Sequence, residues 1–83
     1  MKKKEQNYVP FYECKDQFSA ILIYAMEGVL DSTEWRDGVC WFIFEDRSRC
    51  EDIISSHLKG QISVSSKVLQ DSMNTIKGII YAH

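Results

Sequence analysis

The spacing of hydrophobic residues is most informative on either side of an Asp37-Gly38 pair. Asp-Gly suits the two-residue turn of a type I′ β-hairpin, because both positions accept a positive φ at little cost. We therefore predict two antiparallel strands, over residues 29–36 and 39–45. Residues 39–44 are all apolar. A strand without in/out alternation needs cover on both faces, from helices, a second sheet or another protein chain.

A two-residue turn also predicts which residues of the hairpin share a face. One face carries the expected core residues Thr33, Trp35, Cys40, Phe42 and Phe44, and the other carries Ser32, Glu34, Arg36, Val39, Trp41 and Ile43. Trp41 thus stands among polar neighbours, and two interpretations remain. The favoured one is that a helix or the strand at residues 8–14 covers it. The other is that Trp41 contacts a partner or a second copy of the chain.

The segment before the hairpin predicts an edge strand followed by a buried helix. Residues 8–14 are rich in aromatic residues, and Pro10 restricts this strand to the edge of a sheet. Asp16 is a good N-cap for a helix that runs to about Glu27, with Gly28 in the left-handed position at its end. Apolar residues occupy a wide stripe of this helix, so we expect it to be largely buried.

A second helix is predicted directly after the hairpin. Ser48 and Glu51 have the spacing of a capping box, and Asp46 is a competing cap. The apolar stripe of this helix includes His57 at its end, and Gly60 terminates the helix.

The C-terminal part completes the predicted fold with a third helix. Residues 61–64 form a short extended connector, and Ser65 or Ser66 caps a helix that continues to the last residues. The 83 residues form a polar tail (residues 1–7) and a single domain (residues 8–83). The predicted class is α+β, with a small, mainly antiparallel sheet of about three strands packed by three helices in the order β-α-β-β-α-α.

The cysteines and the apolar runs indicate a reduced, cytoplasmic protein. Three cysteines lie in apolar neighbourhoods without paired spacing, which is typical of buried thiols in the cytosol. The longest apolar run, residues 20–26, is far too short to span a bilayer. We therefore expect no contact with a membrane and a location in the cytoplasm of a host cell.

The chain lacks the residue patterns of an active site. His57 and Cys50 are seven residues apart on one helix, which separates them by about 10 Å, too far for a nucleophile and its base. A zinc site from Cys14, Cys40, Cys50 and His57 would need four elements to converge. The four glycines are isolated and form no phosphate-binding loop. We expect no enzyme, no cofactor and no metal.

The acidic residues are concentrated in the middle of the chain. The net charge is −2, but residues 27–52 carry eight acidic and three basic residues, a local charge of −5. Such a surface repels nucleic acid, whose binding depends on Lys and Arg. It can attract a basic protein surface. The simpler interpretation, which we favour, is that these acids keep a small protein soluble.

The C-terminal two thirds carry a pattern of motifs: Phe42-x-Phe44-Glu45-Asp46, a helix that ends at Gly60, residues 64–69, and Ile76-Lys77-x-Ile79-Ile80-Tyr81. With an aromatic strand and a hydrophobic helix in front, this resembles a family of small domains of unknown function found in phages, prophages and their hosts. The resemblance covers residues 8–81. It implies an origin in a mobile genetic element, but the family has no established active site to carry over. The Trp-rich hairpin and the acidic middle depart from its usual pattern.

The favoured hypothesis is a non-catalytic interaction protein of a phage or mobile element. It would bind and modulate a host protein with a basic surface, for example by inhibiting an antiviral defence component such as a CRISPR effector. The expected binding residues lie on the hairpin: Glu34, Trp35, Asp37, Trp41, Glu45 and Asp46. One alternative is a nucleotide- or nucleic-acid-binding module that uses residues 2–4, Arg36, Arg47 and Arg49. Another is a homodimeric accessory protein.

Overall fold

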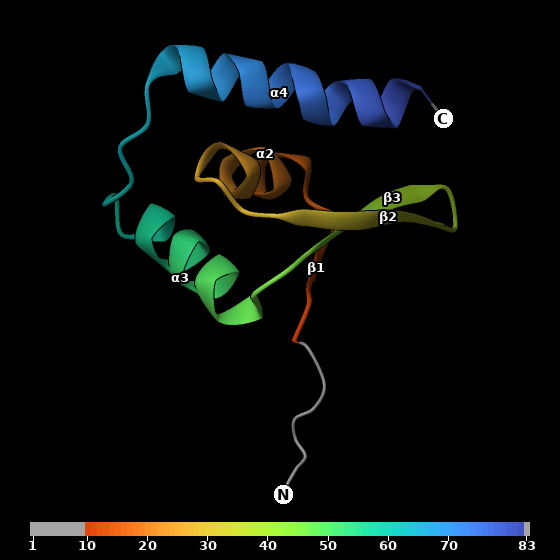
Figure 1. Cartoon of the computed structure of the whole chain (residues 1–83), viewed down its shortest axis with the longest axis horizontal. Coiled ribbons are helices and arrows are strands. Elements are labelled where there is room, and N and C mark those ends of the chain that lie inside the picture. The colour runs from red at the N-terminus through yellow and green to blue at the C-terminus, as the bar shows by residue number, and fades with distance from the viewer. Residues whose placement is uncertain (1–9, 83) are drawn as a thin grey trace, which may run out of the picture.

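The computed structural model describes residues 10–82, so the predicted tail and the first residues of the first strand lie outside the described part. Within it, three strands and three helices follow the predicted order (Figure 1). Their bounds are β1 Tyr12–Cys14, α2 Gln17–Ala25, β2 Leu30–Arg36, β3 Val39–Phe44, α3 Arg47–Leu58 and α4 Ser66–Tyr81. The fold is α+β, as the sequence predicts.

The three strands form one antiparallel sheet in the order β1-β3-β2. The predicted hairpin register is confirmed, with Arg36 opposite Val39 and Trp35 opposite Cys40. Asp37 and Gly38 adopt φ values of 53° and 78°, which are those of a type I′ turn. The pairing of β2 with β3 is irregular between Leu30 and Ser32, where the hairpin meets the helices.

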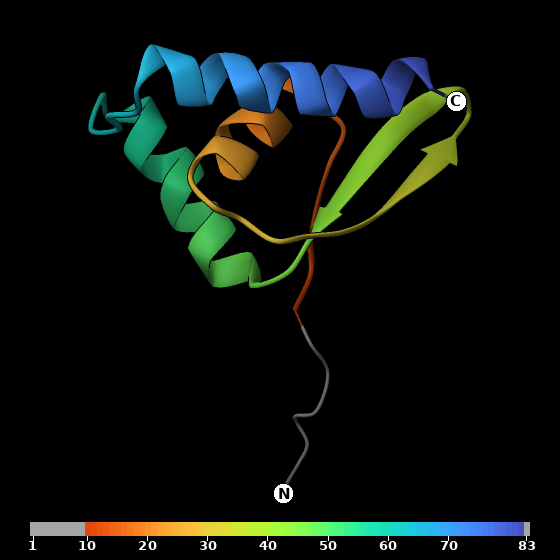
Figure 2. The same cartoon turned by 45° about the horizontal axis from the view of Figure 1, so that its top comes forward.

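Helix α2 is the centre of the molecule. It lies between the sheet and α4, with α3 along its side (Figures 1 and 2). Five of its nine residues are buried, because helices or strands contact it from several sides. Its wide apolar stripe therefore predicts its burial correctly. The core joins α2 to Phe42 and Phe44 of β3, Cys50 and Ile53 of α3, and Ile76 of α4.

The end of α2 differs from the prediction. The residue in the left-handed conformation is Glu27, with φ of 67°, and Gly28 has no positive φ. Gly28 is required for a different reason: a Cβ at this position would lie 2.4 Å from Ile23 Cγ2 and 2.8 Å from the Ile23 carbonyl oxygen. The glycine thus lets the chain turn back against the last turns of α2 and enter β2.

Helix α3 ends before Gly60, which has a φ of 72°, as predicted, but its N-cap and its buried stripe differ from the prediction. Its N-cap is Asp46, whose carboxylate accepts a hydrogen bond from the Arg49 amide, so the competing cap replaces the predicted capping box at Ser48. Its buried stripe ends early, because His57 and Leu58 are exposed. Helix α3 packs on the short helix α2 and on β1, and in its last turn His57 lies beside Phe18 of α2 but stays exposed. Residues 61–64 form a connector without strand pairing, and Ser65 caps α4.

Candidate functional site

The six residues predicted to bind a partner do not form one surface. Glu34 and Trp41 lie opposite each other on the outer face of the hairpin, the face directed away from α2. Trp35 belongs to the inner face, as its pairing with Cys40 requires. Asp37 is in the turn. Glu45 and Asp46 follow β3 at its other end, roughly 20 Å away by the length of a six-residue strand.

The outer face is organised around the Trp41 ring. The Arg36 guanidinium lies 4.8 Å from the ring centroid and the Lys15 ammonium 5.7 Å from it, both within the range of cation–π attraction. Arg36 is held in place by Glu13 and Glu34, through N–O distances of 3.0 and 2.7 Å. The guanidinium donates hydrogen bonds to these two carboxylates, which raises its pKa, so Arg36 remains charged. We call these five residues the Trp41 array.

No described helix covers the Trp41 array. Trp41 is partly exposed and does not belong to the core cluster of the described residues. Strand β1 lies beside β3 in the same sheet and therefore cannot cover it. The favoured interpretation of Trp41, a cover by a helix or by residues 8–14, is thus wrong for the part of this segment that the structure describes. Arg36, rather than a packed element, shields the ring.

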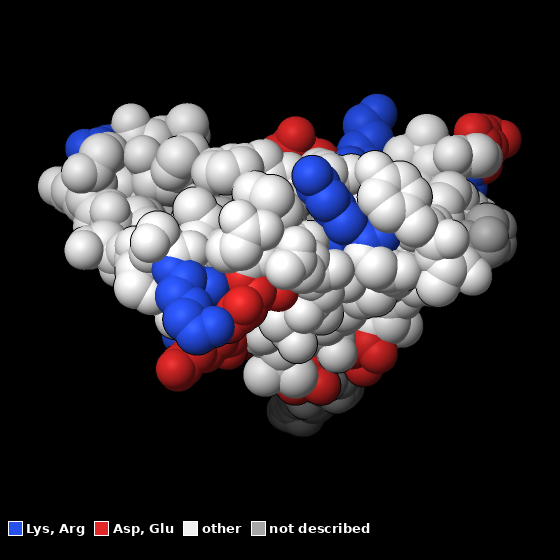
Figure 3. All heavy atoms as spheres, turned by 90° about the horizontal axis from the view of Figure 1, so that it is seen from above, with Lys and Arg blue, Asp and Glu red and all other residues white. Residues whose placement is uncertain are grey.

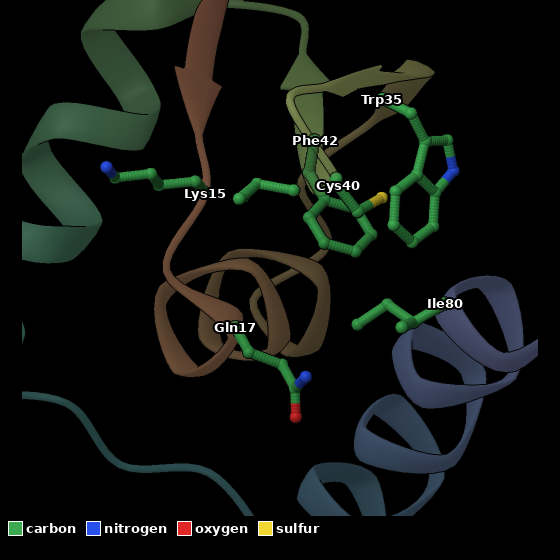
Figure 4. A pocket seen from close by; sticks show the side chains of 8 residues that line it. Lys15, Gln17, Trp35, Cys40, Phe42 and Ile80 are labelled. Atoms are coloured by element: carbon green, nitrogen blue, oxygen red, sulfur yellow. The ribbon is translucent and has the colours of Figure 1, made fainter.

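The inner face of the hairpin carries a cavity of about 240 Å³. It lies where α4 extends beyond α2 toward the tip of the hairpin (Figures 1 and 2). Its walls come from the hairpin, from the start of α2 and from α4: Lys15, Gln17, Trp35, Gly38, Val39, Cys40, Phe42 and Ile80 (Figure 4). Only Trp35 of the predicted binding residues lines it.

The arginines that could bind phosphate already contact other groups. Arg36 lies between two carboxylates, and Arg47 pairs with Glu51 at 3.1 Å. The Arg49 guanidinium donates hydrogen bonds to the carbonyl oxygens of Met26 and Glu27, at 2.6 and 3.3 Å, and so joins α3 to the end of α2. The predicted lysines at positions 2–4 lie outside the described residues. These contacts disfavour a phosphate-binding role for the three arginines.

The acidic residues also either lie far apart or already pair with other groups of the fold. Glu34 pairs with Arg36, and the Asp46 carboxylate caps α3. Figure 3 shows the molecule from the side of α4, where charged groups of both signs lie in small separate clusters on a largely uncharged face. An extended acidic patch is therefore absent from this view.

The His and Cys residues of the described part of the chain form no metal site. No group of three or more His, Cys, Asp or Glu side chains in this part could hold a metal ion. His57 is exposed, and its ring lies 5.5 Å from that of Phe18, between α3 and α2. The three cysteines are buried and unpaired. Burial raises the pKa of each thiol, so all three remain protonated at neutral pH.

Alkaline pH should therefore destabilise the fold through these thiols. Burial raises the pKa of Cys14 from 9.0 to about 12. Below pH 9 the thiol is protonated in both states, whereas between pH 9 and 12 it loses its proton only on unfolding. We expect the free energy of unfolding to fall by roughly 1 kcal/mol per pH unit in that range. Urea titrations at pH 7, 9.5 and 10.5 would measure this decrease in the free energy of unfolding. If a Cys14→Ala variant lost as much stability per pH unit as the wild type, the role of Cys14 would be contradicted.

In comparisons with known proteins, no family model, no curated protein and no solved structure matches the chain. The resemblance to phage-associated domains therefore rests on the sequence pattern alone. None of the helices in the described part of the chain is long and apolar enough to cross a membrane.

Sequence reasoning placed Glu34 and Arg36 on the face of Trp41 but missed Glu13, Lys15 and the cavity. Glu13 and Arg36 are 23 residues apart, and only the pairing of β1 with β3 brings them to one face. A signal for Glu13 was present, because period-2 alternation places it on the face opposite Cys14. Ile80, which forms the α4 wall of the cavity, carries no such signal.

Proposed function

We propose that this chain is a non-catalytic protein-binding module, and that the Trp41 array is the centre of its binding surface. The observation that supports this most directly is a tryptophan held on the open face of the sheet by a fixed arginine. Tryptophan and arginine are the residues most often found at the energetic centre of protein interfaces. Ordered side chains lose little entropy on binding.

The charges of the array indicate the kind of partner. Glu13 and Glu34 pair with Arg36, and Arg36 and Lys15 lie over the ring, so the face has both signs. A complementary partner surface has mixed charge around an apolar centre, rather than the strongly basic surface expected from the sequence. If the chain belongs to a phage or mobile element, as its sequence pattern suggests, that partner is a host protein, for example a component of an antiviral defence system.

A homodimer through the same face has less support. A three-stranded sheet about 20 Å long offers roughly 300 Å² per subunit, from the spacing and rise of its strands. Stable dimers usually bury about 800 Å² per subunit. The nucleic-acid alternative is weakened by the contacts of Arg36, Arg47 and Arg49 described above.

Substitution of Trp41 tests this proposal. We expect Trp41→Ala to weaken partner binding at least about 30-fold, as for a central interface residue, while the fold is retained. Wild type and variant would be used to capture proteins from a nuclease-treated bacterial lysate, and binding of the retained protein would then be titrated. Leu58→Ala is the matched control, because Leu58 is 80% exposed on another element.

The outcomes separate the three hypotheses. A stoichiometric protein that wild type and Leu58→Ala retain and Trp41→Ala loses supports the proposal. Equal retention by all three proteins would contradict the role of the Trp41 array. The homodimer would be favoured if the molecular mass of the wild type doubled as its concentration rose and the Trp41→Ala variant remained a monomer. Retained nucleic acid in an untreated preparation would favour the nucleic-acid module.

A further inference from the structure

The cavity on the inner face of the hairpin is formed by a gap in the layering of the fold. Helix α2 separates the sheet from α4 over only part of the length of α4 (Figure 1). Beyond α2, the last turns of α4 face the tip of the hairpin directly. Ile80 approaches from α4 and Trp35, Cys40 and Phe42 from the hairpin, with their side chains directed toward one another (Figure 4). They line an open pocket of about 240 Å³, and Trp35 and Val39 on its rim are 36% and 40% exposed.

Five of the eight residues that line this cavity are apolar, and two of these five are aromatic. Trp35 and Phe42 contribute two aromatic side chains, and Val39 and Ile80 contribute aliphatic ones. The Cys40 thiol is uncharged at neutral pH, because burial raises its pKa. Thiol and aromatic groups both make favourable contacts with a ring.

The cavity offers no charge to a ligand. Lys15 is the charged residue among its lining, but its ammonium group points away from the cavity (Figure 4) and lies near Trp41. An ionised ligand group would therefore lose its hydration without gaining a partner, which is strongly unfavourable. Gln17, at the start of α2, is the remaining polar side chain of the lining.

The volume of the pocket indicates the size of a group that would fill it. A dry cavity of roughly 150 Å³ is known to bind benzene, and sites for drug-sized molecules have volumes of about 300–1,000 Å³. A cavity of about 240 Å³ lies between these. We propose that it binds a small, uncharged aromatic molecule of one or two fused rings.

This site lies on the face of the hairpin opposite Trp41, and Lys15 is the residue that it shares with the Trp41 array. An NMR titration with indole tests it. We expect saturable shifts at Trp35, Cys40, Phe42 and Ile80, with a Kd on the order of 1 mM, the affinity available to so few atoms. Indole-3-carboxylate and tryptamine, which carry opposite charges, should each bind at least ten times more weakly.

Two variants test whether indole binds in this cavity. Ile80→Phe should abolish the shifts by filling the cavity, and Leu58→Phe, a change of the same kind at an exposed position, should leave them unchanged. If Ile80→Phe does not fold, Trp35→Leu replaces it, with an expected loss of at least ten-fold in affinity. Unchanged binding in the folded variant, or shifts outside the cavity, would overturn the proposal.

The probes and the variants also distinguish the alternatives. Equal binding of indole and indole-3-carboxylate would overturn the conclusion that the ligand is uncharged. Tighter binding of N-acetyltryptophanamide than of indole would overturn the proposal that the ligand is a free small molecule. It would indicate that the cavity binds a tryptophan side chain of a peptide instead. Trp41→Ala should leave the indole titration unchanged, and Ile80→Phe should leave capture of the protein partner unchanged, so either proposal can fail alone.

Discussion

Ile76→Ala is expected to lower the free energy of unfolding by about 3–4 kcal/mol, which is within the range for a fully buried isoleucine. Ile76 has no exposed surface, and it is one of only two buried residues of α4. The main contact of α4 with the rest of the fold is α2. Removal of the Ile76 side chain therefore leaves a void at the centre of the surface that holds α4.

Urea denaturation followed by circular dichroism would measure this loss, with Val68→Ala as the control. Val68 lies on the same helix but is 43% exposed, so its truncation should change the free energy of unfolding by less than about 0.5 kcal/mol. Amide exchange should accelerate first in α4, because its attachment is weakened most. A loss below 1 kcal/mol for Ile76→Ala would show that α4 is not held by this contact.

The hairpin could be predicted in detail because its determinants are local. Two residues that accept positive φ fix the turn, and a two-residue turn fixes which side chains share a face. The central position of α2 follows from an apolar stripe too wide for a helix with one buried side. The N-cap of α2 at Asp16 is likewise confirmed, since its carboxylate accepts a hydrogen bond from the Ser19 amide.

The surroundings of Trp41 could not be predicted, because they depend on contacts between distant parts of the chain. The apolar sequence of β3 predicts cover on both faces, yet the described helices cover one. On the other face, Ile43 is buried between its strand neighbours Glu13 and Ser32, and Trp41 is shielded by Arg36. Charged side chains with long apolar stems can thus replace a packed element. The buried stripe of α3 was predicted too long for a related reason. Periodicity shows which side of a helix is apolar, but it does not reveal where the neighbouring surface ends.

The link between α2 and β2 provides the second large expected effect. Gly28→Ala should lower the free energy of unfolding by about 3 kcal/mol, at the upper end for overpacking. The added Cβ would lie 2.4 Å from Ile23 Cγ2 and 2.8 Å from the Ile23 carbonyl oxygen. The side chain is buried and the carbonyl belongs to the helix, so neither can move aside at little cost. The Gly28 amide also donates a hydrogen bond of 2.8 Å to that carbonyl.

A change one residue earlier separates this explanation from the usual role of glycine at a helix end. If a left-handed conformation were the requirement, it would concern Glu27, whose φ is 67°. Glu27→Gly should therefore stabilise the fold, by up to about 1 kcal/mol, because glycine adopts this conformation without strain. Thermal and urea unfolding of both variants would show the opposite signs. A Gly28→Ala variant as stable as the wild type would mean that the chain can leave α2 along another path, and the contact with Ile23 would then not explain the glycine.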